Sequence, residues 1–431
     1  MSRPARPARL IAGAILVGSL ALAGCGRADD AASSGATSSI DDSPATGAIA
    51  VWAPDGDANV LEEVIAPFLE DNPDADVEIT LVPESEYTTK LRSAISAGSG
   101  PDVALLYTES QAQFTRTGAF APVPDGVADA DAFFDGAWDA GVIDGAAYSV
   151  PWYSYTYALV YRADLAAAAG ASAPETWDDM VPFFESLESA GAVRGFAADV
   201  GWDVYTGQLV AQLLWQAGGE LLTDDGAQWT LDTPEMVAAI EHDASFFTSG
   251  SADTATPLFL DSQPYFVEGK TASSITGPWV IGQYDDVAGE EGWTAENVGT
   301  APLPAGDGGS VGALAGGSWG VLDDSENPDS AWKLIRFLAE EDTQLTQYEA
   351  YSSLPAVESA WEDPAISGEP LLDAFFTQLQ TAKTYPQSTT WPQVVTQLGA
   401  EMEGVAKGAQ TAEEAAANIQ AFAESLGTGS E

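Results

Sequence analysis

The spacing of apolar residues after position 47 switches between the periods typical of strands and of helices. Residues 48–52 form a short apolar run, and the apolar residues of 59–70 fall on one helical face. Alternation at 77–81 is followed by helical spacing at 87–97 and a second apolar run at 103–106. Strand, helix, strand, helix and strand with short connections predict a parallel, doubly wound α/β sheet.

Helix ends can be read at several places. Asp57 is placed to cap the 59–70 helix, and Asn72-Pro73 stops it. Further helices are expected over 206–217, 234–247 and 392–404.

The carboxyl ends of the predicted strands carry groups that suit a ligand, and ligands of open α/β sheets bind beyond those ends. The first strand ends at Asp55, and the third ends at Tyr107-Thr108-Glu109. Carboxylates accept hydrogen bonds from hydroxyls, and an aromatic face covers apolar C–H surface. This pairing indicates a neutral carbohydrate, although Asp55 also suits a turn and Glu109 a helix start.

The amino terminus has the anatomy of a signal peptide. Arg3, Arg6 and Arg9 precede an apolar run from Leu10 to Leu22 that is too short for a permanent transmembrane helix. Leu22-Ala23-Gly24-Cys25 resembles a bacterial lipobox, which implies cleavage before Cys25 and lipidation of its thiol. We therefore expect a signal peptide at 1–24 and an exported lipoprotein on the outer face of the cell membrane. An ordinary secreted protein with one stray thiol is the alternative.

Residues 25–47 have almost no large apolar side chain, so they are expected to form a flexible linker. The body that follows is long enough for two domains. The whole chain has 14 basic and 66 acidic residues and a formal net charge of −52. Such a surface repels phosphate backbones and anionic lipid, so nucleic acid and direct membrane binding are not expected. A generally acidic proteome or a salt-adapted organism would explain the charge.

Few residues of the chain suit catalysis or metal binding. The chain has one histidine, His242, and one cysteine, so it has no Cys/His metal pattern, and no cofactor motif is present. Gly316-Gly317-Ser318-Trp319-Gly320 fits the G-x-S-x-G pattern, but in that hydrolase fold the histidine follows the serine, whereas His242 precedes Ser318. A glycosidase-type carboxylate pair stays open among so many acids.

Six phrases of the body resemble, in order, the bacterial extracellular solute-binding proteins of family 1, the carbohydrate-binding lipoproteins of ABC importers. The phrases are IAVWAPDGDANVLEEVIAPFLEDNPDADVEI, YTTKLRSAISAGSGPDVALLY, YSVPWYSYTYALVYRADL, GPWVIGQYD, ALAGGSWGVLDDSENPDSAWKLIRFLAEED and WPQVVTQLGAEMEGVAKGAQTAEEA. The resemblance covers essentially 48–426. It implies two α/β lobes joined by hinge strands, a sugar in the cleft between them, a permease partner, a monomer and no catalysis.

Carried onto this chain, the resemblance places crossovers near 150–154, 314–318 and 352. Lobe 1 would then comprise 48–152 and 318–352, and lobe 2 would comprise 153–317 and 353–427. At the first crossover, alternation predicts Tyr153, Tyr155 and Tyr157 on one face and Trp152 on the other. Each could contact ligand or pack in the hinge.

Other candidates stand at helix starts, where free N–H groups face the cleft. Trp202-Asp203, with Tyr205, precedes one helix, Trp391 begins another, and Trp279 resembles the family's aromatic platform. The residues expected to bind ligand are Asp55, Tyr107, Glu109, Trp152, Tyr153, Tyr155, Trp202, Asp203, Trp279, Gly317, Ser318, Trp319 and Trp391. The tryptophans expected in the core are Trp177, Trp215, Trp332 and Trp361.

Three functions stay open at this point. The first is an importer's receptor for a mono- or oligosaccharide. The second is the same fold binding a polyamine, a peptide or a phosphodiester, and the acidic candidates favour a cationic or polyhydroxy ligand over an anion. The third is a secreted glycoside hydrolase, which needs two carboxylates about 5–10 Å apart across the sugar.

Overall fold

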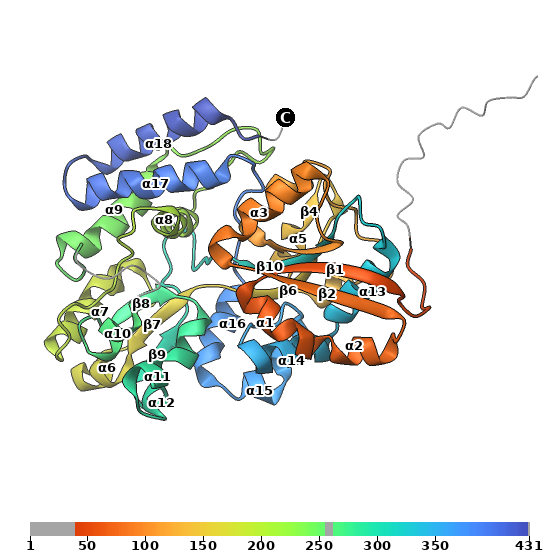
Figure 1. Cartoon of the computed structure of the whole chain (residues 1–431). Coiled ribbons are helices and arrows are strands. Elements are labelled where there is room, and N and C mark those ends of the chain that lie inside the picture. Colours follow the sequence, from red (N-terminus) through yellow and green to blue (C-terminus); the bar gives the residue numbers. More distant parts are fainter. Residues whose placement is uncertain (1–38, 255–261, 430–431) are drawn as a thin grey trace, which may run out of the picture. The chain divides into compact units, whose positions relative to one another are not determined.

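The computed structural model describes residues 39–254 and 262–429 (Figure 1). The expected signal peptide, Cys25 and most of the expected linker lie outside these residues. The strands are β1 (Gly47–Pro54), β2 (Ala75–Val82), β3 (Val103–Tyr107), β4 (Val142–Ile143), β5 (Ala146–Ala147), β6 (Val150–Tyr155), β7 (Ala158–Arg162), β8 (Ser273–Thr276), β9 (Val298–Ala301) and β10 (Ala315–Val321).

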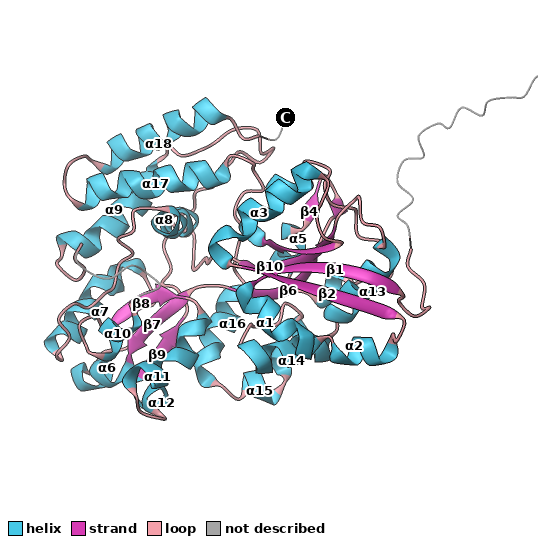
Figure 2. Cartoon of the chain, in the orientation of Figure 1, coloured by secondary structure: helices cyan, strands magenta, loops and turns pink. Residues whose placement is uncertain are grey.

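Helices surround the strands (Figure 2). They are α1 (Asp55–Val64), α2 (Ala66–Asp71), α3 (Glu84–Ala97), α4 (Gln111–Thr115), α5 (Asp135–Ala140), α6 (Ala163–Ala169), α7 (Trp177–Ser189), α8 (Val204–Gln216), α9 (Pro234–Thr248), α10 (Gln263–Val267), α11 (Tyr284–Ala288), α12 (Trp293–Asn297), α13 (Pro328–Leu338), α14 (Glu341–Tyr351), α15 (Pro364–Ser367), α16 (Asp373–Leu379), α17 (Trp391–Ala406) and α18 (Ala412–Leu426). None of the helices in the described ranges has the length and apolar composition needed to cross a membrane.

Two larger sheets organise the body, and the α/β class predicted from the sequence is confirmed. The first sheet has the order β2-β1-β3-β10-β6, and the second has the order β8-β7-β9. β1 pairs in parallel with both β2 and β3, as the strand and helix spacing predicts. β10 pairs antiparallel to β3 and β6, so the first sheet is mixed. The sequence did not predict these antiparallel strands because they return from distant parts of the chain.

The first predicted helix is divided in two. α1 ends at Val64 and α2 begins at Ala66, because Pro67 has no N–H to continue the helical ladder. Asp57 lies inside α1 and is buried, so its expected role as the cap is wrong. Its carboxylate instead accepts a hydrogen bond from Trp152 Nε1 at 3.2 Å.

The chain changes sheets at two places near the expected crossovers. β6 ends at Tyr155 in the first sheet and β7 begins at Ala158 in the second. On the return, β9 belongs to the second sheet and β10 to the first. The expected lobe boundaries at 152/153 and 317/318 therefore fall inside strands of the first sheet, a few residues from the change of sheet.

One buried glutamine ties β6 to the segment that follows α14. Gln344 is fully buried, and its Nε2 donates to Pro151 O at 3.0 Å. Its Oε1 accepts from the backbone N–H groups of Ala356 at 2.8 Å and Val357 at 3.0 Å. Ser154 N also donates to Leu354 O at 3.0 Å. The expected third crossing near 352 thus runs beside the first.

The end of the expected linker is held against the body. Lys333 of α13 is almost fully buried and pairs with Asp41 at 2.8 Å and with Asp329 at 2.7 Å. Ala45 is buried, and its N–H donates to Asn72 Oδ1 at 2.6 Å. The linker therefore ends before Asp41 and not at Gly47. Its composition could not reveal this, because Lys333 lies almost 300 residues away along the chain.

Candidate functional site

The ends of β1 and β3 lie at one edge of the first sheet, because the two strands are parallel neighbours. Asp55 begins α1 and is half-buried, and Tyr107 at the end of β3 is also half-buried. Glu109 is exposed and lies in a short 3₁₀ turn, Thr108–Ser110. Thr108 Oγ1 donates to Gly316 O at 3.2 Å, which holds this turn against β10. The structure thus brings these three predicted residues to the edge where β10 begins.

Three aromatic rings meet where the chain leaves β6 for the second sheet. The ring centroids of Tyr155 and Trp279 are 5.2 Å apart, and their planes differ by 85°. Tyr157 lies 6.2 Å from Trp279 and 6.1 Å from Tyr155, with interplanar angles of 85° and 81°. Gly277 permits this packing, because a Cβ there would lie 1.8 Å from the Trp279 ring. We call Tyr155, Tyr157 and Trp279 the aromatic corner.

Glu109 acts electrostatically on this corner. Burial is the main cause that raises the pKa of the Tyr157 phenol well above its ordinary value, and the Glu109 carboxylate raises it further. Tyr155 and Tyr385 have raised pKa values because of burial, neighbouring tyrosines and Glu109. The phenols therefore stay neutral and can donate hydrogen bonds at physiological pH.

A polar bridge joins the Glu109 turn to the segment before α17. Gln387 Nε2 donates to Thr108 O at 3.4 Å and also to Tyr385 O at 3.4 Å. Arg116, which follows α4, donates from Nε to Gln387 O at 3.3 Å. This bridge brings Tyr385 and Gln387, which lie more than 200 residues after β3, to the site edge.

Two of the expected crossover tryptophans belong to the core. Trp152 and Trp319 are each 1% exposed, and their ring centroids lie 6.1 Å apart. Tyr153 and Tyr155 are partly exposed, so the predicted alternation holds within β6, and the face with Trp152 points into the core. Tyr157 lies beyond the end of β6 and is buried, so its predicted place on the same face as Tyr153 and Tyr155 is wrong. Trp152 and Trp319 therefore offer no surface to a ligand in this structure, contrary to expectation.

Gly317 and Ser318 serve the packing of the strand. Ser318 is buried, and its Oγ accepts from Gln111 Nε2 at 3.1 Å, so the expected ligand contact is not available. Gly317 is also buried, and a Cβ there would lie 2.8 Å from the Tyr153 ring. Its contribution is to let the Tyr153 ring approach β10. Because Ser318 contacts Gln111 while His242 contacts Trp177 and Met180, the two do not form a catalytic dyad.

The start of α8 is capped by Asp203, which was predicted as a ligand contact, and a small cavity lies beside it. Asp203 accepts from Tyr205 N at 2.9 Å, and Trp202 is half-buried with a positive φ of 52°. A cavity of about 30 Å³ lies next to the corner residue Tyr157. It is lined by Tyr157, Phe196, Ala197, Asp199, Tyr205, Gln208, Leu209, Gln212 and Ile275.

Trp391 is a core residue and not a ligand contact. It is fully buried, with its ring 5.3 Å from Tyr385 and 6.2 Å from Trp229. Trp215, Trp332 and Trp361 are buried as expected, whereas Trp177 is half-buried and stacks on His242 at 4.0 Å.

Sequence reasoning missed four residues near the site. Asp199, Gln212, Tyr385 and Gln387 do not stand at a predicted strand end, crossover or helix start. Burial raises the pKa of Asp199, and Thr206 Oγ1 donates to its carboxylate at 2.8 Å. The Tyr385-Pro386-Gln387 run was the one available signal, since an aromatic and an amide flank a proline in a polar stretch.

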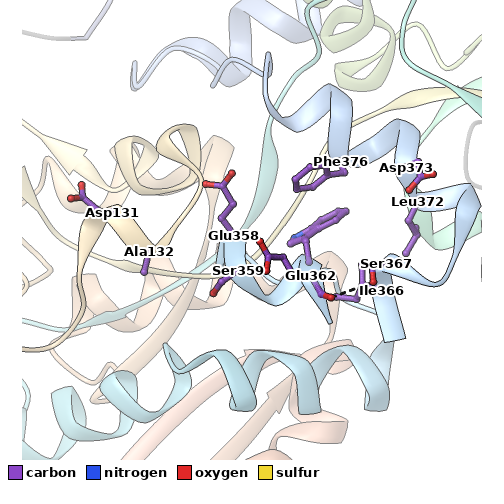
Figure 3. A pocket seen from close by; sticks show the side chains of 11 residues that line it. Asp131, Ala132, Glu358, Ser359, Glu362, Ile366, Ser367, Leu372, Asp373 and Phe376 are labelled. Atoms are coloured by element: carbon purple, nitrogen blue, oxygen red, sulfur yellow. Dashed lines mark hydrogen bonds between the residues drawn. The ribbon is translucent and has the colours of Figure 1, made fainter. Parts of the chain in front are cut away.

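A larger hollow of about 620 Å³ lies elsewhere (Figure 3). Its apolar side chains are Trp361, Ile366, Leu372 and Phe376, and its acidic ones are Asp131, Glu358, Glu362 and Asp373. It shares no residue with the strand-end edge or the aromatic corner. Within the described ranges, no group of three or more His, Cys, Asp or Glu side chains could hold a metal ion.

Two sheets flanked by helices are joined where the chain passes from one to the other, and aromatic and acidic side chains lie at that passage. This arrangement is typical of binding proteins with two α/β lobes. The family model for bacterial extracellular solute-binding protein matches residues 54–345. The chain therefore belongs to the bacterial extracellular solute-binding proteins.

Individual relatives agree with this assignment. A binding protein of Brucella abortus is 26% identical over 362 residues, covering 81% of this chain and 85% of the relative. The sugar-binding protein MalE of Xanthomonas citri matches with a TM-score of 0.80 and 25% identity, covering 88% of this chain and 97% of that one. The GacH receptor of Streptomyces glaucescens, solved alone and with acarbose, matches with a TM-score of 0.76 and 25% identity, covering 88% and 98%.

Proposed function

We propose that this protein is the sugar-binding receptor of an ABC importer. It captures a mono- or oligosaccharide between the two sheets and delivers it to the permease as a monomer. The observation that carries the proposal is the aromatic corner, where Trp279 packs on Tyr155 at the end of β6. The Glu109 turn is held against β10, the strand that pairs with β6. Aromatic faces and a hydrogen-bond acceptor are the two features that sugar recognition needs.

The relatives support a sugar over other solutes. MalE of Xanthomonas citri is described as sugar-binding, and the GacH receptor was solved with acarbose. Both are binding proteins, which also supports a receptor over the glycoside hydrolase that the sequence left open. The ligand contacts that we propose are Asp55, Tyr107, Glu109, Tyr153, Tyr155, Trp202, Asp203 and Trp279.

Export and anchoring form the second part of the proposal. The family is extracellular, and the lipobox at 22–25 would attach the mature chain to the membrane through Cys25. Cys25→Ser should then release the protein into the medium. Recovery of that variant in the membrane fraction would contradict the anchor.

A thermal-shift screen of neutral and charged sugars tests the binding function. A ligand that binds only the folded state raises its apparent stability, and excess ligand at about 100 times Kd adds about 2.7 kcal/mol. We expect at least one sugar to raise the melting temperature. If no sugar raised the melting temperature but a peptide or a polyamine did, the protein would be a receptor for that solute and not for a sugar.

Two tryptophan variants then locate the site. Trp279→Ala should weaken sugar binding by about 1–3 kcal/mol, because it removes an aromatic face. Trp293→Ala is the matched control, since Trp293 is also partly buried but packs on Arg162 at 5.1 Å. The control should lower stability without changing affinity. Equal losses of affinity in the two variants would show that Trp279 does not contact the ligand directly.

Closure of the two sheets on the ligand is the proposed motion, as in other hinged binding proteins. Small-angle scattering should show a smaller radius of gyration once the sugar found in the screen is added. An unchanged radius would contradict closure.

A further inference from the structure

We propose that Tyr351 is a further ligand contact, which binds the sugar together with Asp55 at the start of α1. The sequence placed a crossing of the chain near 352 but did not mark the tyrosine beside it. This inference rests on the proposed function, because it adds a residue to the same site.

The Tyr351 side chain lies against the first turn of α1. A Cβ on Gly56 would lie 2.0 Å from Tyr351 Oη and 2.7 Å from its Cζ. Gly56 directly follows Asp55, which is the first residue of α1 and a proposed ligand contact. The helix that carries Tyr351, α14, contacts α1 (Figure 1). The phenol therefore stands beside Asp55 at the edge where the strands of the first sheet end.

Gly56 makes room for this ring. The three atoms that lie nearest to a Cβ at this position all belong to the Tyr351 side chain. Gly56 is not among the glycines with a positive φ, so its backbone conformation does not require a glycine. Glycine destabilises a helix relative to alanine. The glycine therefore serves the approach of the phenol to α1, at some cost to the helix.

The backbone next to Tyr351 is strained. Ser352 follows α14 with φ 58° and ψ 22°, in the left-handed region that glycine usually occupies at a helix end. Its N–H donates to Tyr348 O at 2.7 Å, which holds this conformation. Strain of this kind is concentrated at functional sites. The outlier at Ser352 is therefore a second sign of function at this point of the chain.

The segment after Tyr351 also reaches the strand that leads to the aromatic corner. Pro355 forms an isolated bridge with Tyr153, and Ser154 N donates to Leu354 O at 3.0 Å. This short segment thus connects β6 to the start of α1. Tyr351 therefore belongs to the same face of the protein as the proposed contacts on β6.

The Tyr351 ring keeps surface for a ligand. The residue is 48% exposed, although its phenol packs on Gly56. A tyrosine ring covers apolar C–H surface, and its hydroxyl both donates and accepts hydrogen bonds. The ionised carboxylate of Asp55 accepts hydrogen bonds from hydroxyl groups. Together the two side chains offer the aromatic face and the mixed hydrogen bonding that a polyhydroxy ligand needs.

Titration calorimetry with two alanine variants tests the inference. The probes are maltotriose, acarbose and tagatose, followed by any other sugar that raises the melting temperature in the thermal-shift screen. Tyr351→Ala should weaken the affinity about tenfold, because it removes an aromatic face from the site. Phe376→Ala is the matched control, since Phe376 is an exposed aromatic residue of the separate hollow in Figure 3. The control should leave the affinity unchanged.

A double-mutant cycle with Gly56 tests the contact itself. The methyl group of Gly56→Ala would push the Tyr351 ring aside, so this variant should weaken the affinity although it retains the tyrosine. In the Tyr351→Ala background, the same change should cost no further affinity. Equal losses from Gly56→Ala in both backgrounds would show that it acts without Tyr351 and would overturn the inference.

The other outcomes separate this inference from the proposed function. Unchanged affinity in Tyr351→Ala would overturn the inference and leave the sugar receptor intact. An equal loss in Phe376→Ala would also overturn it, because the loss would then not be specific to the edge of the first sheet. Absence of binding by every sugar in the screen would instead reject the proposed function. Melting curves verify that each variant is folded.

Discussion

Trp152 Nε1 donates to Asp57 Oδ1 at 3.2 Å, and both side chains are buried. The bond joins the strand that leaves the first sheet to the first helix of the body, across 95 residues of chain. Buried polar groups need such partners, and a hydrogen bond to a charged acceptor is stronger than one between neutral groups. A residue that the sequence suggested for ligand contact therefore stabilises the fold.

Replacing Trp152 should affect stability and not binding. Trp152→Phe removes the Nε1–H donor and part of a fully buried ring, so we expect a loss of about 2–4 kcal/mol in the free energy of unfolding. Urea denaturation measures this loss, and titration of folded variant with sugar should give an unchanged affinity. A variant of normal stability with weakened sugar binding would show that Trp152 contacts the ligand.

The sequence predicted the elements of the body better than the surroundings of single side chains. β1, β2 and β3 and their parallel pairing follow from local periodicity, and α3, α8, α9 and α17 lie where apolar spacing indicated helices. Periodicity says which residues share a face, but not which face is covered. Trp152 and Trp319 are covered because β10 joins β3 to β6, a pairing set by residues more than 150 positions apart.

Trp391, at a helix start, is a second residue whose burial the sequence does not reveal. Its position at the first residue of α17 fits a site residue, but Tyr385 and Trp229 cover it. Glu109 was proposed from its place at a predicted strand end and Trp279 from its resemblance to the family's aromatic platform, and both stay predicted ligand contacts. Tyr385 and Gln387 reach the same edge only through tertiary contacts.

Two adjacent glycines of β10 should respond differently to a methyl group. A Cβ on Gly316 would lie 2.1 Å from Tyr153 O, so Gly316→Ala must move backbone in the β6–β10 pair. A Cβ on Gly317 would lie 2.8 Å from the Tyr153 ring, and that ring is partly exposed and can turn aside. We expect a loss of about 1–3 kcal/mol or more for Gly316→Ala and a smaller one for Gly317→Ala. Equal losses in the free energy of unfolding, measured by urea denaturation, would show that the Tyr153 ring is as fixed as the backbone.

His242 should make the protein less stable as the pH falls. Burial lowers its pKa from 6.5 to about 4, while the unfolded chain takes up the proton near 6.5. Its contribution to stability is therefore present above about pH 6.5 and is lost as the pH falls toward 4. His242→Phe should reduce the drop in free energy of unfolding between pH 7 and pH 5 by on the order of 2 kcal/mol. If the free energy of unfolding fell equally in variant and wild type, His242 would take up its proton in the folded state as readily as in the unfolded chain.

Asp243 should have the opposite pH dependence. Burial, and secondly the Asp199 carboxylate, raise the pKa of Asp243 from 3.8 to about 7. The folded state therefore keeps a proton that the unfolded state releases near pH 3.8, and this contribution to stability is lost as the pH rises toward 7. Asp243→Asn mimics the neutral acid at every pH, so its stability relative to wild type should increase by a few kcal/mol between pH 4 and pH 8. A constant difference across that range would contradict a protonated Asp243.

Gln344 limits where the proposed closure could bend the chain. Its single side chain holds Pro151 of β6 together with 356–357, and Ala356 and Val357 pack in the same core as Trp152 and Trp319. These segments are therefore tied to the first sheet. If the two sheets close on a ligand as proposed, the bend would have to fall beyond this tie, after Tyr155 where β6 ends.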